Sequence, residues 1–189
     1  MDNTFGAWLN TPVRSGRLAV VKMPPSARGR KSRLLRTDEP PHDLLVVIRA
    51  TPADREAAID EMVEDAELSS RQYVVEAIPK AREVLYGVSV FARRPGDDVA
   101  AVIDRFTGAP AFIEITIGAL RASDFEALPT GANVDHFDIQ LIAGIREQDP
   151  PAKTDSLRQA AARVLAAGGP LRPNPAYAGG TAESPREDR

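Results

Sequence analysis

The sequence predicts an α+β domain, because apolar residues recur with the period of a strand in some segments and of a helix in others. Residues 111–117 and 136–142 place apolar side chains at every second position, as in a strand with one buried face. Residues 59–66 and 99–106 place them three and four positions apart, as on the buried stripe of a helix. Hydrophobic residues make up 43% of the 189 residues and charged residues 27%, as in ordinary globular proteins, so we expect one packed core.

Proline and glycine divide the chain into three parts. Prolines 12, 24, 25, 40 and 41 interrupt the start of the chain, and a proline has no backbone N–H to donate to a sheet. We therefore expect a basic, proline-punctuated arm over residues 1–41 and a folded domain over residues 42–169. Residues 170–189 are rich in proline and glycine and bury little apolar surface, which predicts a flexible tail.

The folded domain is expected to begin with a strand and a helix. Residues 43–48 are a continuous apolar run rich in β-branched side chains, which predicts a central strand buried on both faces. Thr51 can cap a helix, Pro52 fits its first position, and Asp54 stands at the capping-box position. The helix has an apolar stripe formed by Ile59, Met62, Val63 and Ala66. Its opposite face is acidic, which is typical of a solvated helix face.

The rest of the domain follows the same alternation. The expected elements are a hairpin over residues 72–92 that turns at 79–83, a helix over 96–106, strands over 111–117 and 136–142 with a loop between them, and a helix over 155–167 that ends at Gly168. The order strand, helix, strand, strand, helix, strand predicts a ferredoxin-like sandwich, with an extra strand and a C-terminal helix.

Composition also indicates where the protein works. The chain begins without a basic segment followed by an apolar one, and no apolar run approaches the roughly 20 residues that a membrane-spanning helix needs. It contains no cysteine, so disulfides and thiolate metal sites are excluded. We expect a cytoplasmic protein without a membrane partner. The excess of arginine over lysine is typical of a GC-rich bacterial genome.

Charge is distributed unevenly along the chain. Eight basic residues and no acidic one lie between Arg14 and Arg36, whereas residues 42–189 are acidic overall. Such a run can follow a phosphate backbone, and the residues expected to contact a polyanion are Arg28, Arg30, Lys31, Arg33 and Arg36. The alternative is that the arm only solubilises the terminus or folds back on the acidic body.

Four segments resemble blocks of small uncharacterised proteins of actinobacteria. They are residues 86–92 (YGVSVFA), 118–130 (GALRASDFEALPT), 135–141 (DHFDIQL) and 169–175 (GPLRPNP). The resemblance covers about the C-terminal half of the chain. It implies a coherent domain through residue 175, and it brings no known activity and no catalytic residues.

Several polar residues are candidates for chemistry. Ser89, His136 and Asp138 are the residue types of a nucleophilic triad, but no G-x-S-x-G turn surrounds Ser89, which favours a serine buried in a strand. His136 and Asp138 share a strand face, and Glu114 lies on the polar face of another strand, so a metal site is conceivable. Two ligands on one strand are a weak pattern, and we assign no metal site.

A third pattern joins Arg49, Ser89 and Glu114. In this order they resemble the arginine, serine and glutamate of ADP-ribosyltransferase folds, which implies that the arginine grips a dinucleotide phosphate and the glutamate orients a ribose. The flanking residues do not match beyond residue type. No P-loop and no G-x-G-x-x-G motif is present, so the sequence specifies no cofactor.

Two classes of function follow. The preferred one is a non-enzymatic binding or regulatory module whose basic arm contacts nucleic acid or an acidic protein. The alternative is a small nucleotide-acting enzyme or toxin-like effector that uses polar residues near the strand ends. Its candidate residues are Arg49, Ser89, Glu114, Arg121, His136 and Asp138.

Overall fold

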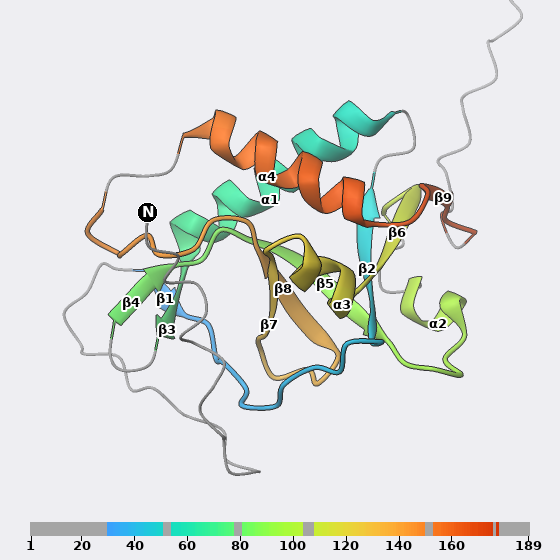
Figure 1. Cartoon of the computed structure of the whole chain (residues 1–189), viewed down its shortest axis with the longest axis horizontal. Coiled ribbons are helices and arrows are strands. Elements are labelled where there is room, and N and C mark those ends of the chain that lie inside the picture. The colour runs from blue at the N-terminus through green and yellow to red at the C-terminus, as the bar shows by residue number, and fades with distance from the viewer. Residues whose placement is uncertain are drawn as a thin grey trace, which may run out of the picture.

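Six strands form one sheet in the spatial order β7-β8-β5-β2-β6-β9, and every neighbouring pair in it is antiparallel. The computed structural model describes residues 30–50, 54–77, 81–103, 108–149, 153–175 and 177. The strands of the large sheet are β2 (Leu45–Ala50), β5 (Gly87–Arg93), β6 (Ala111–Thr116), β7 (Glu126–Pro129), β8 (His136–Gln140) and β9 (Arg172–Pro173). A small sheet of β1 (Lys31–Ser32), β3 (Tyr73–Ala77) and β4 (Ala81–Val84) lies at the end remote from β9 (Figure 1).

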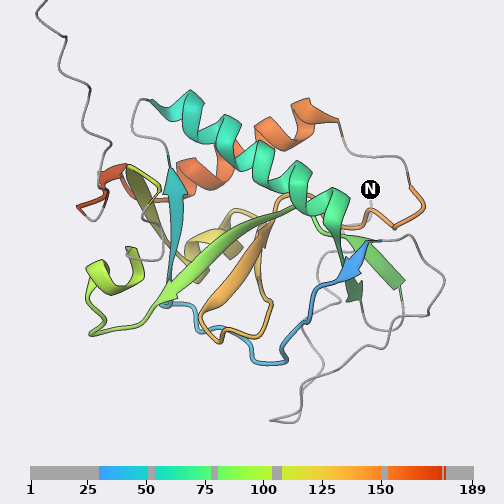
Figure 2. The same cartoon turned by 180° about the vertical axis from the view of Figure 1, so that it is seen from behind.

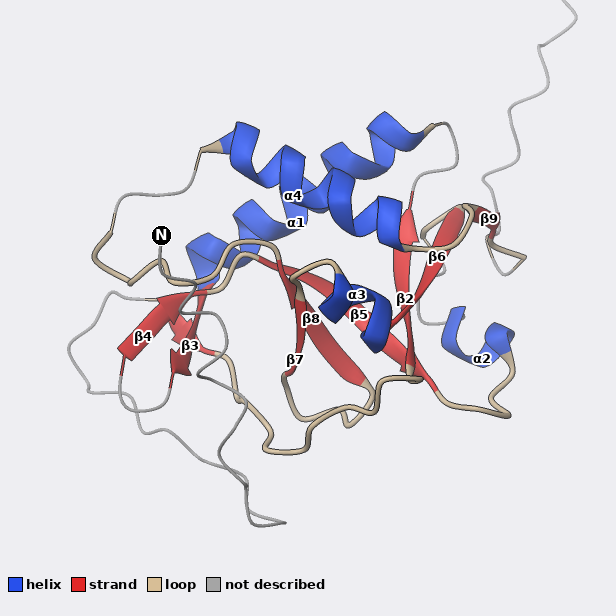
Figure 3. Cartoon of the chain, in the orientation of Figure 1, coloured by secondary structure: helices blue, strands red, loops and turns tan. Residues whose placement is uncertain are grey.

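Helices cover the two faces of the large sheet unequally. The long helices α1 (Arg55–Gln72) and α4 (Thr154–Ala167) pack against each other over one face (Figures 1 and 2). The short helix α2 (Val99–Ile103) contacts the other face, where Val102 packs against Val47 and Phe112. A further helix, α3 (Ile117–Ala122), directly follows β6 (Figure 3).

The core lies between the large sheet and the two long helices. The predicted stripe of α1 is buried, since Ile59, Met62, Val63 and Ala66 are each at most 6% exposed. Strand β2 has neighbours on both sides, and three successive residues, Val46, Val47 and Ile48, are fully buried. The prediction of a central strand covered on both faces is therefore confirmed.

The start of α1 differs from the expectation. Asp54 itself is the N-cap, and its carboxylate accepts a hydrogen bond of 2.7 Å from the backbone N–H of Ala57. An aspartate satisfies an orphan N–H at this position as well as threonine does. The predicted cap Thr51 and the predicted first helical residue Pro52 lie outside the described residues.

The expected hairpin is divided between the two sheets. β3 and β4 pair with each other in the small sheet, and β5 pairs with β2 and β8 in the large one. Strand β4 begins at Ala81, inside the turn expected at 79–83, and the strand expected over 84–92 is interrupted at Leu85 and Tyr86, both of which are buried. Continuous apolar character hid this break, because a strand that changes sheets stays buried throughout.

Two regions expected to be irregular carry regular structure. The segment between the strands near residues 111 and 136 contains α3 and β7. The expected tail contributes β9, which pairs with β6, and Asn174, which donates a 2.7 Å hydrogen bond to the carbonyl of Ala109. Pairing with β6 supplies partners for backbone groups that composition alone leaves to solvent.

Residues 33–41 form a segment that we call the strap. It runs from the small sheet along β7 to the start of β2 (Figure 1). Arg36 N–H donates to the carbonyl of Pro129, and Gly131 N–H donates to that of Leu34, at 2.9 and 3.0 Å. The described part of the expected arm is thus hydrogen-bonded to the body. The folded part therefore begins before His42, the residue at which we expected the domain to start.

The α+β class is confirmed, and the ferredoxin-like arrangement is not. That sandwich is built from split βαβ units, in which another strand lies between the two strands that a helix joins, whereas β2 and β5, on either side of α1 in the sequence, are direct neighbours. The predicted C-terminal helix is present as α4. In the described part of the chain, no helix is both long and apolar enough to cross a bilayer.

Candidate functional site

The face of the large sheet that turns away from α1 and α4 carries buried polar side chains. On β5, Val88 and Val90 belong to the core, so Ser89 between them points to the other face. On β8, Phe137 and Ile139 belong to the core, and His136, Asp138 and Gln140 point away from it. These three residues are at most 9% exposed. Buried polar groups need partners, so their contacts define a site.

Four side chains on this face form a continuous chain of hydrogen bonds. Ser89 Oγ lies 2.6 Å from His136 Nε2, and His136 Nδ1 lies 3.0 Å from Thr130 Oγ1 and 3.1 Å from the Thr130 carbonyl oxygen. The Thr130 hydroxyl donates to Asp138 Oδ2 at 2.5 Å. We call Ser89, His136, Thr130 and Asp138 the polar relay.

The relay has one consistent direction. A carbonyl oxygen only accepts, so its contact with Nδ1 requires the proton on that nitrogen, and in the neutral ring Nε2 then accepts from the Ser89 hydroxyl. This is the arrangement of a nucleophile and a base whose ring is oriented by a third group. It differs from the triad considered from the sequence, because Thr130 stands between His136 and Asp138.

Strand register and two glycines place these groups. Ser89 is paired with Asp138 across β5 and β8, and the histidine lies two residues along the same face. A Cβ on Gly87 would lie 3.0 Å from the Cβ of Asp138, so glycine gives that carboxylate its room. Gly131 has a φ of +75°, which turns the chain sharply after Thr130.

Thr130 was not a candidate from the sequence. Threonine is common in strands and turns, and only Gly131 beside it indicated a special backbone position. Its role depends on the distance to Asp138, eight residues away along the chain.

Two of the predicted polyanion-binding residues are used inside the fold. The Arg33 Nε lies 3.7 Å from Asp138 Oδ2, and its guanidinium stacks 3.8 Å from the centre of the Tyr73 ring. Arg36 donates to five backbone carbonyls of the turn between β7 and β8, namely those of Thr130, Gly131, Asn133, Val134 and His136. Its side chain is 6% exposed. Both arginines fix the strap to the polar face.

Arg30 instead joins three segments at the far end of α1. Its Nε donates to the carbonyl of Ser70, and its Nη1 donates to the carbonyl of Glu147 at 3.1 Å. An exposed cation is the sequence neighbour of each of these three residues: Lys31 follows Arg30, Arg71 follows Ser70, and Arg146 precedes Glu147. We call Arg30, Lys31, Arg71 and Arg146 the basic end.

Carboxylates only partly balance this cluster. Glu67 pairs with Arg71 at 3.3 Å, although the Arg71 side chain is 73% exposed, and Glu147 pairs with the neighbouring Arg82 at 3.0 Å. The partners of Arg30 are neutral carbonyls, which accept its hydrogen bonds and do not neutralise its charge. Arg28, also predicted to contact a polyanion, lies outside the described residues.

The other candidate residues make their contacts elsewhere in the fold. Arg49 forms ion pairs with Glu61 and Asp65 of α1. Glu114, 8% exposed, is held between Arg93 at 2.6 Å and Arg172 at 3.0 Å. Arg49, Ser89 and Glu114 thus have separate partner sets, and the contacts of the described residues do not join them into the ADP-ribosyltransferase pattern.

Arg121 also forms a site of its own. It pairs with Glu39 of the strap at 3.3 Å and with Glu126 of β7 at 3.4 Å. It therefore fastens the strap to the sheet rather than joining the polar relay.

The described residues contain no group of three metal-ligating side chains, so His136, Asp138 and Glu114 do not come together as a metal centre there. Comparisons with protein-family models, with curated proteins and with solved structures find no match to this chain. The polar relay and the basic end are therefore the two candidate sites among the described residues.

Proposed function

We propose that this protein is a binding module that holds the phosphate backbone of a nucleic acid at its basic end. The observation that carries the proposal is the grouping of the exposed cations Lys31, Arg71 and Arg146 around Arg30, whose hydrogen-bond acceptors are neutral carbonyls. Eight cations without an acidic residue lie between positions 14 and 36 of the sequence, and Arg30 and Lys31 are two of them. Cations grouped in this way gain affinity by releasing the counterions of the phosphates that they contact.

The structure divides the basic segment by task. Arg33 and Arg36 are used inside the fold, whereas Lys31 is exposed and adjoins Arg30, whose side chain contacts the residues next to Arg71 and Arg146. Phosphate contacts position a nucleic acid without reading its sequence. The aromatic residues that a single-strand stacking platform needs are few in this chain, at 5%. We therefore expect binding with little sequence preference and a strong dependence on salt.

The test compares two triple variants with equal charge change. The first replaces Lys31, Arg71 and Arg146 by glutamine, and the second makes the same change at the exposed cations Arg55, Arg94 and Arg163, which belong to other parts of the surface. Binding of the full chain to mixed-sequence duplex DNA and to RNA is measured at about 50 mM and about 200 mM salt. For DNA, the first variant should lose about 0.9 from the slope of log K against log salt for every phosphate contact removed.

Equal binding by the two triple variants would reject the basic end. Polyglutamate serves as a second probe, because an acidic protein is the alternative partner. Binding to polyglutamate without binding to nucleic acid would show that the cations recognise carboxylates instead of phosphates. Circular dichroism of each variant confirms that the fold is kept, as expected for exposed surface changes.

The second candidate is a small enzyme, which the 2.6 Å contact between Ser89 and His136 favours. In it, Ser89 Oγ attacks an electrophilic acyl or phosphoryl centre while its proton passes to His136 Nε2. That proton then goes to the leaving group, and water completes the cycle by the same route. Thr130 and Asp138 keep the ring in the required tautomer.

A fluorophosphonate probe tests this candidate without knowledge of the substrate. The serine oxygen bonds to phosphorus, fluoride leaves, and His136 takes the proton. Labelling of Ser89 that is lost in Ser89→Ala and kept in Ser156→Ala, an exposed serine, supports the enzyme. A folded protein that stays unlabelled shows that the relay is a structural network.

A further inference from the structure

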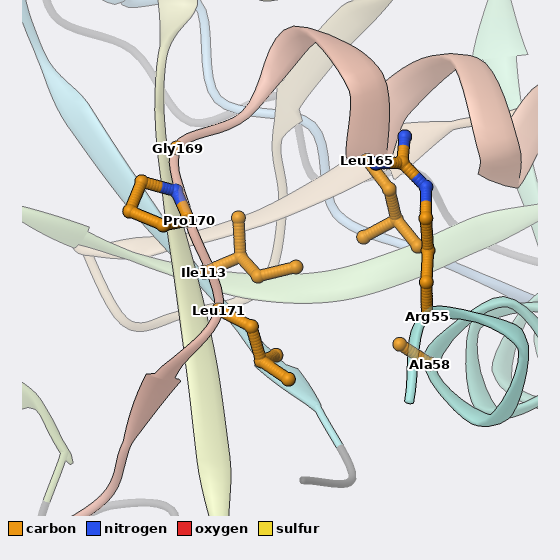
Figure 4. A pocket seen from close by; sticks show the side chains of 7 residues that line it. All are labelled: Arg55, Ala58, Ile113, Leu165, Gly169, Pro170 and Leu171. Carbon is orange, nitrogen blue, oxygen red and sulfur yellow. The ribbon is translucent and has the colours of Figure 1, made fainter. Parts of the chain in front are cut away.

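A small cavity lies on the side of the molecule remote from the basic end, between the start of α1, the end of α4 and β6. Its volume is about 150 Å³. Seven residues line it, as Figure 4 shows: Arg55, Ala58, Ile113, Leu165, Gly169, Pro170 and Leu171. None of them belongs to the basic end or to the polar relay.

The walls of the cavity are apolar and held in place. Ala58, Ile113 and Leu165 are each at most 5% exposed and are members of the core. The chain that follows α4 passes so close to β6 that a Cβ on Gly168 would lie 2.7 Å from Ile113 Cγ2. Gly169 N–H donates to the Glu114 carbonyl at 2.9 Å, which fixes this wall to β6. An apolar cavity of this size is large enough to hold benzene.

Arg55 supplies the single charged group of the lining. Figure 4 shows its side chain rising along one side of the cavity, with the guanidinium towards α4. Its Nη2 donates to the carbonyl of Ala162 at 3.5 Å, and no ion pair of Arg55 occurs among the described residues. A guanidinium has five donors, so several are available for a ligand.

Arg55 occupies a position at which the helix dipole disfavours a positive charge. It is the first residue of α1, where the positive end of the dipole favours acidic side chains and disfavours a cation. A residue that departs from local electrostatic preference without a carboxylate partner among the described residues is a candidate for function. An anion at this place would be attracted by both the guanidinium and the helix.

We propose that this cavity binds a small carboxylic acid with a benzene-sized apolar body. The apolar body lies against Ile113 and Leu165, and the carboxylate pairs with the Arg55 guanidinium. Apolar walls with one oriented charged group are the usual composition of a small-molecule site. Arginine matches a carboxylate with two parallel hydrogen bonds, which gives the site its preference for acids over neutral analogues.

The test uses benzoate as the probe, with benzyl alcohol and acetate as matched controls. Benzyl alcohol keeps the ring without the charge, and acetate keeps the charge without the ring. Binding to the full chain is followed by NMR through the methyl groups of Ala58, Ile113 and Leu165. Benzoate should shift these methyls saturably, and the two controls should bind at least about tenfold more weakly.

Two variants separate the charge from the cavity. Arg55→Gln should weaken benzoate about tenfold or more while leaving benzyl alcohol unchanged, and Lys153→Gln, which removes an exposed cation elsewhere, should change neither. Leu171→Trp places a larger side chain at the partly exposed rim and should weaken both ring-containing probes.

Three results would overturn the proposal. They are the absence of shifts at the lining methyls, equal affinity for benzoate and benzyl alcohol, and benzoate binding that Arg55→Gln leaves intact. Because the probes and variants avoid the basic end, each result is independent of nucleic-acid binding.

Discussion

The two faces of the large sheet are buried by different means. Helices α1 and α4 cover one face with aliphatic side chains, and the residues between them and the sheet form the main core. The other face buries His136, Asp138 and Glu114 and half-buries Ser89, and its cover includes α2 and the strap with its arginines. The first face depends on area removed from water, and the second depends on specific pairs of polar groups. Substitutions on the two faces should therefore destabilise the folded state for different physical reasons.

The largest expected difference separates two neighbouring residues of β6. Ile115 is 2% exposed in the main core, and Thr116 caps α3 by accepting a 3.1 Å hydrogen bond from Ala119 N–H. Ile115→Asp should cost about 4 kcal/mol or more, which is comparable to the whole stability of many domains, because a charge there has no partner.

Thr116→Asp is the matched control, since aspartate is also an N-cap residue. It should change stability by less than about 1 kcal/mol. Urea unfolding followed by circular dichroism measures both variants. A cooperatively folded Ile115→Asp protein of near wild-type stability would show that the two faces have been assigned incorrectly.

The next effect comes from Arg36 on the polar face. Arg36→Ala removes hydrogen bonds from one cation to five carbonyls and should cost about 3 kcal/mol, because hydrogen bonds to charged groups stabilise more than neutral ones. Arg36→Lys should recover only part of this, since an ammonium has three donors. Thermal and urea unfolding test the order, with Lys31→Ala, which is exposed, expected within about 0.5 kcal/mol of wild type. Equal stability of Arg36→Ala and Lys31→Ala would contradict a structural role.

The contrast between the faces also explains what the sequence could predict. The apolar face was predictable because periodicity depends on neighbours within one segment. The stripe of α1 and the apolar run of β2 were confirmed, and Ile113 and Ile115 of β6 lie in the core as predicted, although the opposite face of β6 is buried as well. The pairing of the strands was harder to predict from the sequence. No local signal ends β4 at Val84, because the apolar run continues through Leu85 and Tyr86 into β5, and the short β9 depends on β6, about sixty residues earlier.

The polar face required contacts between distant residues. Ser89 and His136 were candidates by residue type, and their hydrogen bond joins residues 47 positions apart. Arg33 and Arg36 look like any other cations of a basic run, and only the fold shows that they face Asp138 and a ring of carbonyls. Charge counting therefore overstates the number of basic residues that remain for a partner.

A double-mutant cycle sharpens this point for Arg33 and Asp138. Asp138 is fully buried, so Arg33→Gln and Asp138→Asn should show a coupling free energy of about 1–2 kcal/mol. The exposed pair of Arg71 and Glu67, measured in the same way, should give about 0.3–0.5 kcal/mol. Equal couplings in unfolding experiments would mean that burial adds nothing to the Arg33 contact.

The smallest expected effect concerns Glu126, whose strand β7 borders the strap. Burial raises the pKa of this carboxyl above its ordinary value of 4.5, and the opposing attraction of Arg121 is too weak to cancel that cost. The native state therefore keeps a proton at pH values where the unfolded chain has released it. The free energy of unfolding consequently falls as pH rises from about 4.5 through the raised pKa.

Glu126→Gln removes this titration while keeping the size of the side chain. The stability of the variant relative to wild type should therefore increase as pH rises from 4 to 7, and should be constant below that window. The change should be small, because the side chain is 33% exposed and water screens its charge. Urea midpoints measured across this pH range decide the matter. A relative stability that falls with rising pH would mean that the pair with Arg121 outweighs desolvation, and that this part of the polar face is stabilised by its charge rather than in spite of it.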